Sequence, residues 1–282
     1  MEEVNKMKGM TIRKKILPHI VLILLSLFFI FPFIWLLSTS LKTTEDIFKM
    51  PLNIFPRTIR WMNYYEAVND IAFFRYTFNT LFVTAMSIIG QLFGATLVAY
   101  SVSLIEWKGK KIIFALIMST MMIPIQVTMV PVYIVFSKLG LIGSYWPLII
   151  PTFAGAPVYI FLLRQFYLSL PQSLLAAARI DGAAELRTFL QIVLPLCKPV
   201  IASVAVVTFL YTWSDFLSPL IYLNKQEMYT LTLGLQGFLG QHTVEWNKLM
   251  AASALFTIPV VIIFFVAQKQ LIEGITLTGI KG

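Results

Sequence analysis

The chain alternates between long apolar runs and shorter polar connections. Six of the runs are long enough to cross a bilayer as a helix, because a span needs about 20 residues at about 1.5 Å each. These predicted transmembrane helices are residues 16–41, 76–104, 112–136, 145–167, 200–222 and 249–267. The pattern therefore predicts an all-α integral membrane protein, with a first span followed by a core of five spans over residues 76–267.

Basic residues at the borders of these spans predict the orientation. Residues 1–15 hold five Lys and Arg residues, and the connections on the same side hold more of them than the opposite connections. Because Lys and Arg concentrate on the cytoplasmic side, we expect residues 1–15 and the tail 268–282 to be cytoplasmic segments of a protein in the cell membrane. The first apolar run exceeds the length of a signal peptide's apolar region and lacks a small-residue cleavage site, so we expect it to be retained.

Composition supports the membrane class and argues against others. The chain is 58% hydrophobic and 12% charged, against about 45–50% and about 25% in soluble domains. The net charge of +9 has no basic stripe with interleaved aromatic residues, so we expect contact with anionic membrane lipid and none with nucleic acid. The single cysteine, Cys197, cannot form an internal disulfide, and we interpret it as a small packing residue rather than a reactive group.

Motifs for covalent chemistry are missing from the sequence. There is no phosphate-binding glycine loop and no dinucleotide-binding fingerprint. His19 and His242 are far apart, and the lone cysteine has no companion at metal-ligand spacing. We therefore expect no enzyme activity, cofactor or metal in this chain, and uphill transport would need an external source of energy.

Polar residues inside the predicted spans are candidates for a solute pathway. Asp215 is the acidic residue deepest within a span, where a charge costs about 2.5–3.5 kcal/mol on insertion scales. It must therefore line a wet pathway or act as a buried structural carboxylate that bonds a neighbouring helix. Other polar residues in spans are Asn79, Gln91, Gln126 and Thr128. With Trp213, such amides could line a passage for a neutral polyhydroxylated solute, because rings stack on sugar faces and amides pair with hydroxyls.

An aromatic cluster, residues 61–65, lies in the long predicted outer connection between the first two spans. Amphipathic rings are favoured at the level of lipid headgroups. The cluster is therefore either a membrane anchor or a docking surface for a partner outside the cell.

The polar segment at residues 168–199, between the fourth and fifth spans, predicts two short helices. Pro171 and Ser173 are expected to begin the first helix, with Ser173 as its cap. Asp181 and Gly182 are expected to end it, and Asp181 to cap the second helix. The apolar face of the second helix is predicted to comprise Leu186, Phe189, Leu190 and Val193. Pro195 and Pro199 then end that helix and begin the fifth span, so we interpret the segment as an interaction element.

This segment resembles the cytoplasmic EAA loop of ABC importer permeases. The residues that carry the resemblance are Ala177, Ala178, Asp181, Gly182, Ala183, Phe189, Leu194, Pro195 and Pro199. Motifs elsewhere are similar to carbohydrate-uptake permeases, in particular the smaller permease subunit of maltose-type sugar transporters. These motifs are Trp61-x-Asn63-Tyr64, Pro124-x-Gln126-Val-Thr128, Trp213-Ser-Asp215-Phe-Leu-x-Pro219 and the ending from Glu273 to Gly282. The resemblance implies the type I ABC importer permease fold, with a cytoplasmic coupling-helix loop.

The resemblance also implies a function and an assembly. A second, non-identical permease subunit would pair with this chain, and an extracytoplasmic sugar-binding protein would deliver a sugar or oligosaccharide. Two ABC ATPase subunits, which carry ATP and Mg, would dock on the loops and switch the pore. The coupling residues that it implies are Ala177, Ala178, Asp181, Gly182, Ala183, Glu185, Leu194 and Pro195, and the pathway residues are Asn79, Gln126, Trp213 and Asp215.

One position departs from the family pattern. Ala176 stands where the motif has its leading Glu, so docking would depend more on shape and apolar contact, with Asp181 and Glu185 as the remaining acids. Two alternatives stay open from the sequence: an ABC permease for a non-sugar solute, and a secondary transporter that needs no ATPase.

Overall fold

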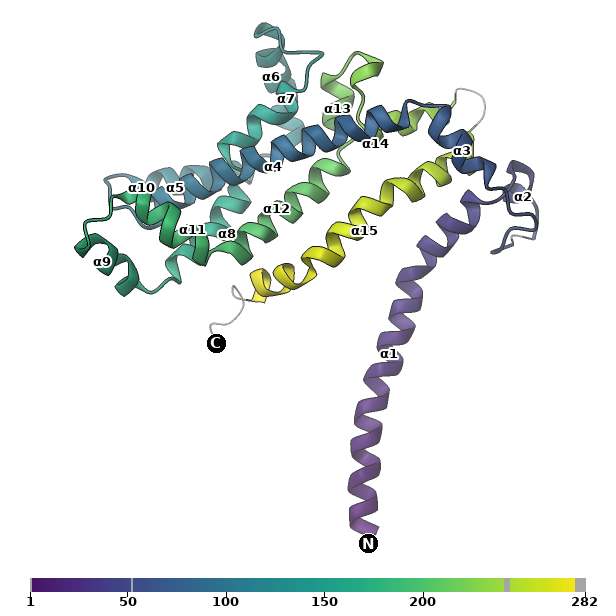
Figure 1. Cartoon of the computed structure of the whole chain (residues 1–282), viewed down its shortest axis with the longest axis horizontal. Helices are drawn as coiled ribbons and strands as arrows, with labels where there is room; N and C mark the ends of the chain where they lie inside the picture. Colours follow the sequence, from purple (N-terminus) through teal and green to yellow (C-terminus); the bar gives the residue numbers. More distant parts are fainter. Residues whose placement is uncertain (1, 52, 241–243, 277–282) are drawn as a thin grey trace. The chain divides into compact units, whose positions relative to one another are not determined.

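The computed structural model describes residues 2–51, 53–240 and 244–276, with side chains for 16–51, 53–240 and 244–269 (Figure 1). Within those ranges the regular structure is helical, apart from one isolated bridge between Leu239 and Val244. The chain forms two compact units, one of Met1–Asp70 with Gly237–Leu255 and one of Ile71–Gln236 with Phe256–Gly282.

The first unit contains the long N-terminal helix α1, Glu2–Ser40, with α2, Thr44–Phe48, and α3, Met62–Asn69. It also contains the first ten residues of α15, Trp246–Thr276. In α1, the part from Ile16 to Ser40 is apolar enough to span a membrane, and none of its most apolar window is buried. Such a helix is suited to direct contact with lipid, since its backbone hydrogen bonds are satisfied internally.

A buried amide holds the first unit together beyond the end of α1. Asn63 is 0% exposed, and its Nδ2 donates to the carbonyl oxygens of Ser40 and Lys42, both at 2.8 Å. Its Oδ1 accepts from Nδ2 of Asn247 at 2.9 Å. Each of these groups would be costly to bury without a partner. Asn63 therefore links α3 to the end of α1 and to the first turn of α15.

In the second unit, α4, Phe73–Ser103, packs against α8, Pro157–Leu168, and α12, Lys198–Trp213 (Figure 1). It also packs against the short 3-10 helix η1, Ile150–Ala154. The remaining elements are α5 Lys110–Thr120, α6 Ile125–Lys138, α7 Trp146–Ile149, α9 Gln172–Ile180, α10 Glu185–Thr188, η2 Phe189–Val193, α11 Leu194–Leu196, α13 Leu217–Tyr222, η3 Gln226–Met228, α14 Leu231–Gly234 and η4 Leu235–Phe238.

Small residues allow α4 to approach the end of η1 closely. A Cβ on Gly94 would lie 2.2 Å from the carbonyl oxygen of Phe153, and one on Gly155 would lie 2.7 Å from the backbone nitrogen of Ala95. Lipid tails are as apolar as the side chains, so packing of this kind drives helix association in membranes more than the hydrophobic effect does. The backbone contact fixes η1 beside the middle of α4.

Two of the predicted spans are broken in the structure. In the third, α5 and α6 meet at a bend of 101°, and Pro124 forms the extended N-cap of α6, because the residue before a proline avoids helical dihedrals and proline donates no hydrogen bond. In the fifth, α12 ends at Trp213 and α13 begins only at Leu217. The described residues hold four helices long and apolar enough to span a membrane. They hold six spans if two bent pairs each count as one, namely Lys110–Thr120 with Ile125–Lys138 and Glu185–Leu196 with Lys198–Trp213.

Candidate functional site

Two features of the second unit are candidate functional sites: the helical elbow formed by α9 and α10, and a polar cavity beside α4. The elbow begins with α9, whose N-cap is Pro171 and which has no side-chain cap. The prediction that Ser173 caps this helix is wrong, since Ser173 lies inside the first turn. Pro171 precedes the helix with an extended backbone, a position that suits proline because no hydrogen-bond donor is needed there.

The end of α9 depends on Gly182. The amide of Gly182 donates to the carbonyl of Arg179 at 3.1 Å, and the amide of Ala183 donates to the carbonyl of Ala178 at 2.9 Å. This pair of bonds is a Schellman motif, which needs a left-handed residue after the helix. Gly182 supplies it with a φ of 74°, so the predicted break at Gly182 has a defined geometry.

The second helix of the elbow differs from its prediction. Ala184, not Asp181, is the N-cap of α10, and it makes no side-chain capping bond. Asp181 is the C-cap of α9, so it lies too early in the chain to cap α10. Phe189 and Val193 are buried, whereas Leu186 and Leu190 are exposed. The prediction that these four residues share one apolar face assumed the periodicity of an α-helix. Phe189–Val193 instead form the π-helix η2, whose different periodicity divides the four side chains between buried and exposed positions.

The predicted coupling residues lie in different environments of the elbow. Ala177, Asp181, Gly182 and Pro195 are exposed, Ala183 and Leu194 are half-buried, and Ala178 is buried. Ala176, the position of the missing family Glu, is exposed. Glu185 is tied into the unit by its carboxylate.

Glu185 anchors the elbow to the end of α4. Its Oε2 accepts a hydrogen bond from the hydroxyl of Tyr100 at 2.6 Å, and its Oε1 lies 3.4 Å from Nη2 of Arg179. The same guanidinium nitrogen donates to the carbonyl of Leu104 at 3.4 Å. The ring of Tyr100 also packs on that of Phe189, with centroids 5.0 Å apart. We name the Tyr100–Glu185–Arg179 contact set the elbow anchor.

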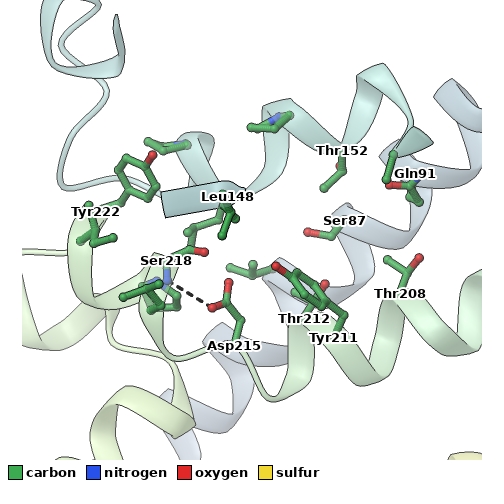
Figure 2. Close-up of a pocket in the computed structure, with 18 of the residues that line it drawn as sticks. Ser87, Gln91, Leu148, Thr152, Thr208, Tyr211, Thr212, Asp215, Ser218 and Tyr222 are labelled. Atoms are coloured by element: carbon green, nitrogen blue, oxygen red, sulfur yellow. Dashed lines mark hydrogen bonds between the residues drawn. The ribbon is translucent and has the colours of Figure 1, made fainter. Parts of the chain in front are cut away.

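The cavity of about 530 Å³ lies in the second unit, between α4, α6, α12, α13 and the segment from α7 to α8. Its polar lining residues are Thr80, Ser87, Gln91, Thr128, Thr152, Tyr159, Thr208, Tyr211, Thr212, Asp215, Ser218, Tyr222 and Thr230. Figure 2 shows Ser87, Asp215 and Thr152 around one common space. Such a lining of hydroxyls and one amide offers many hydrogen bonds and a single charge.

The half-buried Asp215 faces both a cavity and the next helix, so the two roles that the sequence left open stay predictions. It lines the cavity, and its Oδ1 accepts from the backbone amide of Ser218 at 3.2 Å, at the start of α13 (Figure 2). The carboxylate therefore satisfies a backbone amide in the first turn of α13 while it faces the cavity. The break between α12 and α13 is what places it there.

The other three predicted pathway residues do not line the cavity. Trp213 is 1% exposed, stacks between the rings of Phe209 and Phe256 at centroid distances of 5.4 and 5.6 Å, and donates to the carbonyl of Phe256. Asn79 is buried, and its Nδ2 donates to the carbonyls of Glu227 and Tyr229, both at 2.9 Å. Gln126 is exposed. Of the four predicted residues, the structure brings only Asp215 to the cavity.

Sequence reasoning did not assign Ser87, Thr208 and Thr230 to the cavity, and it took Gln91 as one of several span amides. The sequence does contain a pattern that indicates the cavity residues of α4. Thr80, Thr84, Ser87 and Gln91 follow one another at spacings of four, three and four residues, which places them on one face of α4. A polar stripe of this kind within an apolar helix indicates a wet or partnered face.

The aromatic cluster at residues 61–65 divides into two parts. The hydroxyls of Tyr64 and Ser40 lie 2.7 Å apart, and Asn63 is the buried amide of the first unit. Trp61 and Tyr65 are 68% and 67% exposed. Within the cluster, the rings of Trp61 and Tyr65 are therefore the ones that are free to contact either membrane lipid or a protein partner.

Some predictions lie outside the described side chains, namely those on residues 1–15, His242 and the ending from Glu273 to Gly282. Within the described ranges, no three His, Cys, Asp or Glu side chains are grouped as a metal site would require. Cys197 is a buried free thiol. It lies in the apolar core that joins α4, α8 and α12.

Several apolar helices long enough to span a membrane, with a polar cavity beside one of them, are features of a multi-pass membrane protein. The chain belongs to the family described as binding-protein-dependent transport system inner membrane component, whose model matches residues 91–276. Its role is that of a transport permease subunit and not that of an enzyme.

The chain is 36% identical to the arabinooligosaccharides transport system permease protein AraQ of Bacillus subtilis, over 92% of this chain and 93% of that protein. Its fold matches a crystal structure of a bacterial ABC transporter involved in the import of the acidic polysaccharide alginate, with a TM-score of 0.81 at 24% identity over 90% of this chain and 95% of that one. A second structure, of the bacterial alginate ABC transporter with alginate pentasaccharide-bound periplasmic protein, matches with a TM-score of 0.65 at 18% identity over 91% and 92%. The fold is that of ABC importer permeases.

Proposed function

We propose that this chain is the permease subunit of an ATP-driven importer that moves a sugar or oligosaccharide across the cell membrane. The observation that carries the proposal is the polar cavity beside α4, in a chain that belongs to an importer family. Hydroxyl and amide groups there can replace the water that a sugar loses when it leaves solution. The relative AraQ, named for arabinooligosaccharides, supports a saccharide as the cargo.

Two ABC ATPase subunits, which bind ATP and Mg, would dock on the elbow. The elbow offers an exposed surface of small residues around Ala176 and Ala177, and two exposed carboxylates, Asp181 and Glu185. Because the family Glu is absent and Glu185 belongs to the elbow anchor, apolar packing would supply most of the contact. Both termini of the chain would then be cytoplasmic, on the same side as the elbow.

An extracytoplasmic binding protein would deliver the solute, and a second, non-identical permease would complete the pore. The alginate importer of similar fold has been solved with a periplasmic protein bound to its saccharide, which supports such a partner here. The exposed rings of Trp61 and Tyr65 offer one surface for that partner or for membrane lipid.

Co-purification from cells tests the assembly. A tagged copy of this chain, expressed with its neighbouring genes, should bring down two ATPase subunits and a second permease. Reconstituted into liposomes, the complex should hydrolyse ATP faster when its loaded binding protein is added, and should accumulate solute only with ATP. Uptake by this chain in a preparation free of any ATPase would refute the proposal and favour a secondary transporter.

A further inference from the structure

Arg164 carries a charge that no carboxylate of the described residues balances. It lies close to the end of α8 at Leu168, it is half-buried, and it takes part in none of the ion pairs of the described chain. Its guanidinium lies over the ring of Phe114 on α5, with Cζ 4.2 Å from the ring centroid. A cation that is partly removed from water is costly without a counter-ion, so this charge calls for an anion from outside the chain.

The terminal nitrogens of this guanidinium are the atoms that such an anion can reach. Nε of Arg164 is buried and has no hydrogen-bond partner among the described residues. The two terminal nitrogens are not among the buried atoms that lack a partner. A ligand at the surface would therefore bond to the outer edge of the guanidinium, which offers a planar pair of donors.

The start of α5 adds two further cations without a carboxylate. Lys108 and Lys111 are exposed, and neither forms an ion pair within the described part of the chain. The acid in the same turn, Glu106, already accepts from Nζ of Lys110 at 2.7 Å. Lys111 and Phe114 are three positions apart on α5, so they lie on the same face of that helix. The charge of Lys111 therefore lies beside the ring that carries the guanidinium.

These cations lie where two spans end. Arg164 belongs to the apolar span Trp146–Leu168, and α5 begins the bent pair Lys110–Thr120 with Ile125–Lys138. The two ends meet because α5 packs against α8 (Figure 1). Trp107, just before α5, is 36% exposed, and Trp rings are favoured at the level of lipid headgroups. In a bilayer the cations would therefore lie at the depth of the lipid phosphates.

Beyond its basic start, α5 presents an apolar surface. None of its residues is buried, and Ile112, Ile113 and Leu116 are exposed. Either acyl chains or another apolar helix would suit such a surface. The cations at its end favour a lipid, because an anionic phospholipid joins a negative headgroup to apolar tails. An apolar helix would leave the cations unbalanced.

We name Lys108, Lys111, Phe114 and Arg164 the α5–α8 basic corner, and we propose that it binds the headgroup of an anionic phospholipid. The guanidinium of Arg164 binds the phosphate through paired hydrogen bonds, and the two lysines attract it as point charges. The acyl chains lie on the exposed face of α5. This site is separate from the cavity and from the elbow, and it depends on neither the cargo nor the ATPase.

Native mass spectrometry of the purified complex tests the corner, because it counts lipid molecules that stay bound. The probes are phosphatidylglycerol, which is anionic, and phosphatidylcholine with the same acyl chains, which has no net charge. We expect tighter binding of phosphatidylglycerol, and an equal affinity for both lipids would overturn the proposal. Inorganic phosphate is the third probe. If it displaces phosphatidylglycerol at equal concentration, the ligand is a soluble anion and the assignment to lipid is wrong.

Substitutions locate the site on the chain. Lys111→Gln should weaken phosphatidylglycerol binding roughly fivefold, as expected for one basic residue near a lipid surface. Arg164→Gln should weaken it at least as much, and Arg164→Lys should restore part of the loss, since it keeps the charge but not the planar pair of donors. Lys111 is exposed, so its variant keeps the test valid even if Arg164→Gln does not fold.

Lys138→Gln is the matched control. Lys138 is an exposed lysine in the last turn of α6, outside the basic corner, and its loss changes the net charge by the same amount. We expect phosphatidylglycerol binding to stay as in the wild type. An equal loss in Lys138→Gln and Lys111→Gln would mean that net charge alone attracts the lipid, and unchanged binding in Lys111→Gln and Arg164→Gln would likewise overturn the site. A complex that lacks ATPase subunits would defeat the proposed function and leave the lipid result standing.

Discussion

Gly182 shows how much of the elbow depends on one backbone conformation. Its φ of 74° is left-handed, and a Cβ added there would meet no atom within 4 Å. A substitution would therefore strain the backbone by about 1–2 kcal/mol without any steric clash. The strain would fall on the turn that sets the angle between α9 and α10.

We predict that Gly182→Val uncouples ATP hydrolysis from uptake and leaves insertion into the membrane intact. The valine would open the Schellman turn and misplace the elbow against the ATPase. Uptake per ATP hydrolysed, in liposomes, is the measurement. Gly140→Val is the control, because Gly140 has a φ of 68° and equally open surroundings but lies at the end of α6. If Gly140→Val lowers the ratio as much as Gly182→Val does, the coupling role of Gly182 is lost.

The location of a single residue could be predicted where its residue type is unusual for its surroundings. It could not be predicted where packing alone determines whether the side chain faces the cavity or the core. Asp215 stands out as a carboxylate in an apolar run, and the structure places it in the cavity. Trp213, two residues earlier, belongs to the core, because it is the last residue of α12 and stacks on Phe209 and Phe256, whereas Asp215 lies in the break that follows the helix. Asn79 likewise bonds two backbone carbonyls of a distant segment, which no local pattern reveals.

At the scale of elements, the elbow anchor joins α9 and α10 to α4. Removing the Tyr100 hydroxyl while keeping its ring tests this junction, because a hydrogen bond to a charged group contributes about 1.5–3 kcal/mol. We predict that Tyr100→Phe lowers uptake per ATP, whereas Tyr167→Phe does not. Tyr167 is the matched control, since it is a buried tyrosine of the same core whose hydroxyl has no partner among the described residues.

A double-mutant cycle completes the test of the elbow anchor. Combining Tyr100→Phe with Glu185→Ala should give a smaller loss than the sum of the two single losses, since both variants remove the hydrogen bond between these side chains. Additive losses would mean that Tyr100 and Glu185 act separately.

The sequence predicts where the apolar helical segments lie, but it does not predict which of them are continuous helices and which are broken. Pro32, Pro131 and Pro259 lie inside continuous helices, whereas Pro124 follows a sharp break. A membrane helix keeps a proline when neighbouring groups satisfy the freed carbonyl, and the sequence does not say where those neighbours are. The third span was therefore predicted as one helix, and the structure bends it.

At the scale of the whole molecule, the proposed orientation places the elbow and the aromatic cluster on opposite sides of the membrane. The chain is suited to a labelling test because its single cysteine, Cys197, is 0% exposed. We predict that the wild type resists a membrane-impermeant maleimide. Ala176→Cys should react only in inside-out vesicles, and Trp61→Cys only in intact spheroplasts. Labelling of both variants from one side would contradict the orientation.

The elbow anchor and the cavity both include residues of α4, so a rigid tilt of this helix would move both. Tyr100 and Ser87 are 13 positions apart on it (100 − 87), so about 20 Å separates them at about 1.5 Å per residue. A tilt of about 10° about the Tyr100 end would carry Ser87 sideways by about 3.5 Å, which exceeds the length of a hydrogen bond. A small rotation of the elbow would thus be enough to change the shape of the cavity along its α4 side.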